Sequence, residues 1–320
     1  MKESATDTDK PIEDDMRPDY DFSGGVQGME PPTLELVQET KLWRLLPGCD
    51  AGSRLEASGV LAHDGHFHVV FDNVSTIASI DANFAVTPDN CMVGRPDGVC
   101  GFEDITFNDR AQRYYTLVEA MPHPDGGFRP QIEEYTGGFD YLEACWVSLV
   151  FEQENKGLEG IVYLSRGNSD YVLGLCEGNR CLGGAEGRKP GGGRIHVLEK
   201  QDGAWGSIAT IALPKSLDFI DYASIAVRGD HLAVVSQTSA ELWVGRLDPE
   251  RWEVVGDGAV FRFPRSKKKG RIKYCTVEGI SWLDDSTFVA VSDRMKAGVQ
   301  HEKCAKRDQS IHIFRLPATP

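Results

Sequence analysis

The sequence predicts an all-β fold, and within that class a β-propeller of five blades. Two observations support this prediction. Between about Thr33 and Pro317 the chain consists of short segments that alternate apolar and polar residues, with almost no helical periodicity. The same plan of strands also recurs five times, at spacings of roughly 45 to 65 residues, which is the size of a propeller blade.

Each repeat unit opens with a hairpin and adds outer strands, and most units follow a glutamate. The first unit follows Glu56, with strands expected in 58–73, 76–81 and 83–88. The second follows Glu103, with strands in 104–120, 130–136 and 141–151. The third follows Glu159 and covers 160–178, 194–200 and 205–214, and the fourth follows Tyr222 and covers 224–237, 240–248 and 252–264. The last follows Glu278, with strands in 279–283, 287–293 and 309–317.

The last unit has three strands, so one outer strand is missing. The segment TLELVQETKLWRLL, from Thr33 to Leu46, is expected to supply it and to close the ring. Closure removes the exposed edges that an open array of sheets would leave. The alternatives are a sixth blade, within 103–159 or 83–100, and a pair of β-sandwiches. Residues 1–30 are expected to form a flexible acidic tail and residues 31–320 a single propeller domain.

Charge and hydropathy exclude some classes of partner. The formal net charge of -15 argues against nucleic acid, because binding to phosphates needs a dominant basic surface. The sequence lacks an apolar run of about 18 residues, which argues against a membrane span. The N-terminus lacks the pattern of a secretory signal. We therefore expect a cytoplasmic monomer.

The eight cysteines leave their chemical state open between disulfides, free thiols and, less favoured, a metal site. Three pairs lie close enough in the expected plan of strands to form bridges: Cys91 with Cys100, Cys176 with Cys181, and Cys275 with Cys304. Such bridges would tie down long loops that are costly to order.

Two fragments carry a resemblance to a known group of proteins. LEASGVLAHDGHFHVVFDN, from Leu55 to Asn73, and VEGISWLDDSTFVAVSD, from Val277 to Asp293, resemble the opening strands of propellers in the phytase-like esterase and SdiA-regulated group. This resemblance implies a propeller with calcium and ester or phosphoester chemistry. Members of that group usually have six blades, so the count of five departs from the group.

Acidic residues are predicted to gather at one mouth of the central channel. Because adjacent strands of a blade are antiparallel, the start of the first strand and the end of the second meet on one face. Residues before the first strands include Ser58, Glu103, Glu159, Ser224 and Glu278, and residues after the second strands include Asp72, Asn73, Glu119, Glu177, Gln237 and Asp293. Like charges packed around one mouth must hold protons or share a cation, and calcium accepts six to eight oxygen ligands.

These positions give a set of candidate site residues. The predicted calcium ligands are Glu103, Glu159, Glu278 and Asp72, the predicted catalytic residues are Arg294, Asp293 and Glu177, and the predicted ligand contacts are Lys296, Asn73, Gln237 and Glu119. The predicted function is binding of a small anion, with calcium-dependent hydrolysis of phosphate or carboxylic esters at the mouth. Two alternatives remain open: a propeller that binds a ligand or protein without catalysis, and glutamates that serve only as turn residues.

Overall fold

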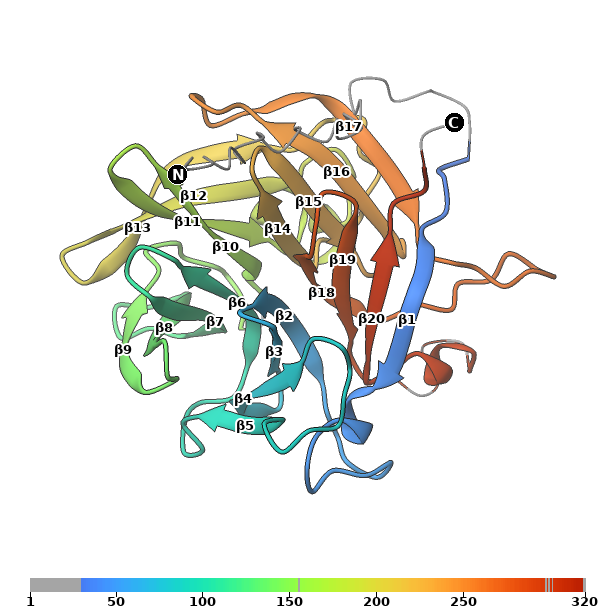
Figure 1. Cartoon of the computed structure of the whole chain (residues 1–320). Coiled ribbons are helices and arrows are strands. Elements are labelled where there is room, and N and C mark those ends of the chain that lie inside the picture. Colours follow the sequence, from blue (N-terminus) through green and yellow to red (C-terminus); the bar gives the residue numbers. More distant parts are fainter. Residues whose placement is uncertain (1–29, 155, 297, 299, 301, 319–320) are drawn as a thin grey trace, which may run out of the picture.

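The computed structural model describes residues 30–154, 156–296, 298, 300 and 302–318. Within these residues, twenty strands form five antiparallel sheets of four strands each, arranged around a common axis (Figure 1). This confirms the predicted five-bladed β-propeller. Of the predicted N-terminal tail, 1–29 lies outside the described residues. In the described part of the chain, none of the helices has the length and apolar character needed to cross a membrane.

The blades follow one another along the chain. The first contains β2 (Ala57–His63), β3 (His66–Phe71), β4 (Val74–Asp81) and β5 (Cys91–Gly94), and the second contains β6 (Phe102–Asn108), β7 (Arg113–Pro122), β8 (Phe128–Thr136) and β9 (Tyr141–Trp146). The third contains β10 (Leu158–Arg166), β11 (Ser169–Cys176), β12 (Arg194–Gln201) and β13 (Ala204–Ala212), and the fourth contains β14 (Ser224–Arg228), β15 (His231–Ser236), β16 (Glu241–Leu247) and β17 (Val254–Arg262). The fifth contains β18 (Val277–Trp282), β19 (Thr287–Ser292), β20 (Ser310–Arg315) and β1 (Glu35–Lys41). The helices are short: η1 (Leu42–Arg44), η2 (Asn179–Cys181), α1 (Gly184–Gly187) and η3 (Cys304–Lys306).

The fifth blade closes the ring as predicted. Strand β1 pairs with β20 from Glu35 opposite Arg315 to Lys41 opposite Ser310. The preceding residue, Leu34, is buried, and its backbone N–H donates to the Arg262 carbonyl of the fourth blade at 2.9 Å. The chain therefore fastens the fifth blade to its neighbour as well as completing it.

The outer strand of the first blade lies later in the chain than predicted. The segment 83–88 is a turn, and the fourth strand is β5. Phe84 has a φ of 58°, and the Asp81 carboxylate accepts the N–H of Asn83 at 2.9 Å. Val86 is 76% exposed, so its apolar side chain does not belong to the sheet. The alternation of NFAVTP was misleading because local turn contacts outweigh the pattern.

The inner strands converge at a ring of small residues. In each blade, one such residue of the inner strand pairs with an aliphatic residue of the second strand. The inner-strand residues are Gly59, Asp104, Gly160, Ser224 and Gly279. A Cβ atom built on Gly279 would lie 2.7 Å from the Cα atom of Gly59. Glycine is required there because two backbones touch across the axis. Figure 1 shows β2, β6, β10, β14 and β18 facing this common centre.

Replacing Gly279 with alanine is expected to lower the free energy of unfolding by about 1 to 3 kcal/mol, because the added methyl group overpacks the axis. Urea denaturation measures this change. Gly206→Ala is the matched control, since the nearest atom to its added Cβ is 3.9 Å away. Equal losses in the two variants would contradict the close contact at the axis.

Candidate functional site at the channel mouth

A β-bulge turns one extra residue of each of four inner strands toward the mouth. The strand register shifts between Ala57 and Gly59, and equivalent shifts in β6, β10 and β18 leave Glu103, Glu159 and Glu278 as the extra residues. Bulges redirect side chains in this way and are common beside active sites. The glutamate-glycine pairs of the sequence are therefore the local signature of a bulge.

The first and fourth blades depart from this plan. In the first blade the extra residue is Ser58, whose hydroxyl donates to the Phe102 carbonyl of the second blade. In the fourth blade the pairing of β14 with β15 is unbroken from Ser224 onward. The position that corresponds to the glutamates is Ala223, so the predicted use of Ser224 at the rim is off by one residue. Three of the five blades thus supply a glutamate.

A second set of polar residues lies near the mouth ends of the second strands, with Glu119 inside β7 and the others directly after their strands. Its members are Asp72, Glu119, Glu177, Gln237 and Asp293, one from each blade. Four of them are fixed in the same way, because their backbone N–H groups donate to a carbonyl just before the inner strand at 2.8 to 3.0 Å. We call the three bulge glutamates and these five residues the mouth cluster. The antiparallel geometry predicted from the sequence brings them to one face.

Burial and, after it, charge repulsion raise the pKa values of the three glutamates. Burial, together with the neighbouring Asp72, Glu278 and Glu119, raises the pKa of Glu103 well above its usual range. Burial and the charge of Glu103 raise the pKa of Glu159 in the same direction, and a hydrogen bond between the two favours the proton on Glu159. Burial, Asp293 and Glu159 likewise raise the pKa of Glu278. The three side chains therefore share one electrostatic environment.

The aspartates of the cluster are also shifted. Burial, with the charges of Glu56 and Asp72, raises the pKa of Asp293 to about 7, although the backbone N–H of Arg294 and the charge of Lys296 oppose this. Burial and Glu56 raise the pKa of Asp72. A carboxyl group with a pKa near 7 can exchange a proton at neutral pH, which is what acid–base catalysis requires.

Cationic and amide groups partly balance this charge. Lys156 forms an ion pair with Glu177, and the charges of Glu177, Glu159 and Glu103 raise the pKa of Lys156 although burial opposes the shift. The Gln237 amide donates to the Glu278 carboxylate. The sequence did not single out Lys156, because the pattern of ENKGLEG is typical of an exposed loop. Its position three residues before Glu159 was the available signal.

Two predicted residues are less closely tied to the cluster. The Asn73 side chain accepts the N–H of Glu56 at 3.1 Å and donates to the Arg54 carbonyl at 3.0 Å, so it stabilises the approach to β2. The Arg294 side chain is exposed. Lys296 is also exposed, and its charge acts on Glu278, Asp72 and Asp293. The roles predicted for these and for all other candidate residues, in calcium binding, ligand binding or catalysis, stay predictions.

Below the mouth, one carboxylate links four blades. Asp104, in the second blade, is 1% exposed, and its Oδ2 atom accepts the N–H of Ile161 at 3.0 Å and the hydroxyl of Ser224 at 3.4 Å. The Ser224 hydroxyl in turn accepts the N–H of Ile280 at 3.2 Å. Gly59 of the first blade packs against Asp104. This axial network holds the blades at the distance that the mouth cluster needs.

Aliphatic residues follow the ring of small residues on every inner strand. Val60, Ile105, Ile161, Ile225 and Ile280 are buried, and each packs into a separate hydrophobic cluster between two neighbouring blades. Beyond the axial network, toward the far face, lies a cavity of about 190 Å³ lined by all five inner strands.

Two cavities flank the mouth on either side of the third blade, the smaller toward the second blade and the larger toward the fourth. Their volumes are about 330 and 370 Å³, and both are lined by Lys156, Glu177 and the loop that includes Leu182. The larger one also reaches Gln237. A small ligand can therefore lie beside two residues of the mouth cluster.

Two of the three cysteine pairs are bonded. Disulfides join Cys176 to Cys181 and Cys275 to Cys304. Cys91 and Cys100 are not bonded to each other and are exposed free thiols, which is the other state that the sequence left open for this pair. Disulfides persist mainly in oxidising compartments, so these bridges count against the cytoplasmic location, which stays a prediction.

The mouth cluster offers the hard oxygen ligands that calcium prefers. Its carboxylate oxygens lie farther apart than the oxygens that surround a calcium ion in a site made of direct protein ligands alone. In the described residues, groups of three or more candidate ligand atoms within 4.8 Å of one another occur elsewhere, at Cys176, Cys181 and His196 and at Glu134, Glu143 and Cys145. The first group contains a disulfide, and two members of the second pair with Lys200. A calcium ion at the mouth would therefore need water among its ligands.

Comparison with solved structures supports the fold. Glutaminyl cyclase from Myxococcus xanthus matches with a TM-score of 0.52 and 12% identity, over 89% of this chain and 98% of that chain. The chain has a propeller fold. Aldose sugar dehydrogenase from Streptomyces coelicolor, in its PQQ-bound form, matches with a TM-score of 0.47 and 13% identity, over 89% of this chain and 99% of that chain. The WD40 repeats of RRP9 match with a TM-score of 0.44 and 8% identity, over 90% and 99%.

The sequence itself matches no family model and no curated protein. At 12% identity, the likeness to glutaminyl cyclase supports the fold alone and leaves the chemistry to be argued from the site. The finer resemblance to the phytase-like esterase and SdiA-regulated group stays a prediction.

Without a cation, the propeller is expected to be more stable in mild acid than in mild base. Because folding raises the pKa values of Glu103, Glu159, Glu278 and Asp293, the folded state holds extra protons between the unfolded and folded pKa values. Stability from these groups is lost as pH rises through that window, which for Asp293 ends near 7. Melting temperatures in chelator should fall by several degrees between about pH 5 and pH 8. A melting temperature that rises steadily over this range would contradict the shifts.

Proposed function

We propose that this propeller binds a small anionic ester at its acidic mouth and hydrolyses it with the help of a calcium ion. The observation that carries this proposal is the convergence of three bulge glutamates and three further acidic side chains in one recess, with their pKa values raised by burial and mutual repulsion. Such an arrangement is costly to fold, so it needs a compensating use. Phosphate and carboxylic esters are the substrate classes that we assign.

The proposed calcium ligands are Glu103, Glu159, Glu278 and Asp72, with water completing the shell. When bound, calcium would supply a positive charge that attracts an anion and polarises its reacting oxygen. The need for four carboxylate ligands to the cation also explains why the rim is negatively charged although the proposed substrate is an anion. The recess repels an anion until the cation neutralises it, so cation and substrate binding are coupled.

The other residues of the mouth cluster have complementary roles in this proposal. Asp293, with a pKa of about 7, accepts a proton from the attacking water and returns it to the leaving group. Glu177 is oriented by its ion pair with Lys156 and faces both flanking cavities. Lys296 and Arg294 neutralise charge that develops on the ester.

Gln237, Glu119 and Asn73 remain the proposed ligand contacts. Gln237 has the best position, because it lines the larger cavity and also donates to Glu278. Gln237 can therefore contact a bound ligand and Glu278 at the same time.

Elemental analysis of the purified protein, together with a panel of phosphate and carboxylic esters assayed with calcium or chelator, tests the proposal. We expect about one calcium per chain, turnover of at least one ester class, and loss of turnover in chelator. Turnover that persists in chelator would overturn the role of the cation. Calcium that raises the melting temperature without any turnover would instead establish the non-catalytic scaffold, with a structural ion.

A further inference from the structure

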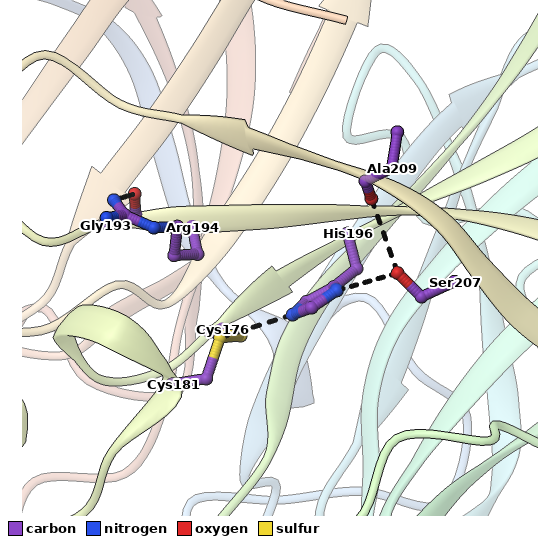
Figure 2. Close-up of a disulfide and its surroundings, with 7 residues drawn as sticks. All are labelled: Cys176, Cys181, Gly193, Arg194, His196, Ser207 and Ala209. Atoms are coloured by element: carbon purple, nitrogen blue, oxygen red, sulfur yellow. Dashed lines mark hydrogen bonds between the residues drawn. A yellow bond between two sulfur atoms is a disulfide. The ribbon is translucent and has the colours of Figure 1, made fainter.

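We propose that Cys176, Cys181 and His196 form a thiol–disulfide exchange site, whose chemistry differs from that of the mouth although its cavity of about 330 Å³ also borders Glu177. Its substrates would be small disulfides and thiols. The site lies on the third blade, where η2 folds back over β12. Figure 2 shows the disulfide, the imidazole and the Ser207 hydroxyl in one line. Three features support the assignment: a directed base, unequal access to the two sulfurs, and an adjoining cavity.

The imidazole of His196 is held with one nitrogen toward sulfur. Its Nε2 atom lies 3.4 Å from the Sγ atom of Cys181, and its Nδ1 atom lies 2.9 Å from the hydroxyl oxygen of Ser207. That hydroxyl donates its single proton to the Ala209 carbonyl at 3.3 Å. In the tautomer that satisfies both contacts, the hydroxyl accepts from Nδ1–H, and the lone pair of Nε2 is directed at Cys181.

The two sulfurs differ in access. Cys176 ends β11 and is 0% exposed, whereas Cys181 is partly exposed and lines the cavity of about 330 Å³. The same cavity is bordered by Phe151 and by the exposed side chains of Val150 and Leu182. An incoming sulfur compound can therefore reach Cys181, while Cys176 is placed to resolve an intermediate. A bridge with only a structural role needs neither the base nor this asymmetry.

The exchange balances as follows. In the reduced protein, His196 takes the thiol proton of Cys181, and the thiolate attacks a small disulfide. A bond forms between Cys181 and one sulfur of that disulfide, the disulfide bond breaks, and the departing thiolate takes the proton from His196. The thiol of Cys176 then attacks Cys181, restores the observed bridge and releases the second thiolate with the proton. Two electrons pass to the small disulfide, and two equivalents of a small thiol return the protein to its reduced form.

The test uses the full chain carrying Cys91→Ser and Cys100→Ser, so that the exposed free thiols do not react. The probe is bis(2-hydroxyethyl) disulfide, with dithiothreitol as reductant. We expect catalysed reduction of the probe that Cys181→Ser abolishes. His196→Gln should slow it about tenfold near pH 7 and move the pH profile of Cys181 alkylation toward that of an ordinary thiol.

Ser207→Ala provides a second variant at an exposed position, and it should give an intermediate rate because it frees the tautomer of His196. Circular dichroism confirms that each variant is folded. Rates equal to the uncatalysed reaction in the parent, or a pH profile unchanged by His196→Gln, would overturn the proposal. Both readouts are independent of calcium and of ester turnover.

Discussion

Glu278→Gln is expected to stabilise the cation-free protein and to weaken its response to calcium. Glutamine keeps the shape of the side chain and removes a charge that repels Asp293, Glu159 and Asp72. In chelator at pH 8 the melting temperature should rise, by an amount equivalent to about 1 to 2 kcal/mol. With calcium, the rise in melting temperature should fall to less than half of the parent value, and ester turnover should fall about tenfold or more.

Opposite signs in the two conditions are the informative result. Asp202→Asn is the matched control, because it removes one exposed carboxylate from the turn between β12 and β13. It should leave both melting temperatures and the calcium response unchanged. Destabilisation of the cation-free protein by Glu278→Gln would show that the repulsion at the mouth is not the dominant force on that side chain.

Asp104→Ala is expected to produce the largest loss of stability. Removal of its carboxylate leaves the buried N–H of Ile161 without an acceptor and the Ser224 hydroxyl without its partner. A buried donor that loses its acceptor costs about 1 to 3 kcal/mol, so the total should reach about 3 kcal/mol or more. Chemical denaturation measures this loss of stability. Asp104→Asn should also be less stable than the parent, though by less than Asp104→Ala, because its amide places a donor where an acceptor is needed.

Two further variants separate the axial network from a general effect of lost charge. Asp109→Ala removes an exposed carboxylate just beyond β6 and should change stability by less than about 0.5 kcal/mol. A double-mutant cycle of Asp104→Ala with Ser224→Ala should give a coupling energy above about 0.5 kcal/mol. Strict additivity would mean that the two residues stabilise their blades independently.

The repeat and its period were readable because each blade is built from the same alternating strands. The glutamates at the start of the second, third and fifth blades also predicted the mouth cluster, because they stand at the same position of the repeat. The fourth blade shows the limit of this reasoning. Its inner strand has no bulge, so the residue that takes the place of the glutamates, Ala223, lies one position before the predicted Ser224.

The repeat pattern of the sequence does not predict which residues make contact between blades. Asp104 could be placed near the axis, but its partners Ile161 and Ser224 come from segments about 60 and 120 residues away, which no local period connects. The pairing of Lys156 with Glu177 depends in the same way on how two loops fold back. The state of the cysteines was open for the same reason, because the reach of a disulfide depends on backbone directions that spacing does not determine.

The pairing of β1 with β20 has a consequence for biogenesis. Residues 35–41 are synthesised before their partner strand, Ser310–Arg315, and the other four blades are synthesised in between. Those blades can form while β1 waits as an unpaired strand, exposed to misassociation. The pairing of β1 with β20 closes a loop that contains four blades, and such distant pairing is slow. A nascent chain arrested before this meeting should be sensitive to protease and should depend on chaperones, whereas the released chain should become resistant to protease in a single step.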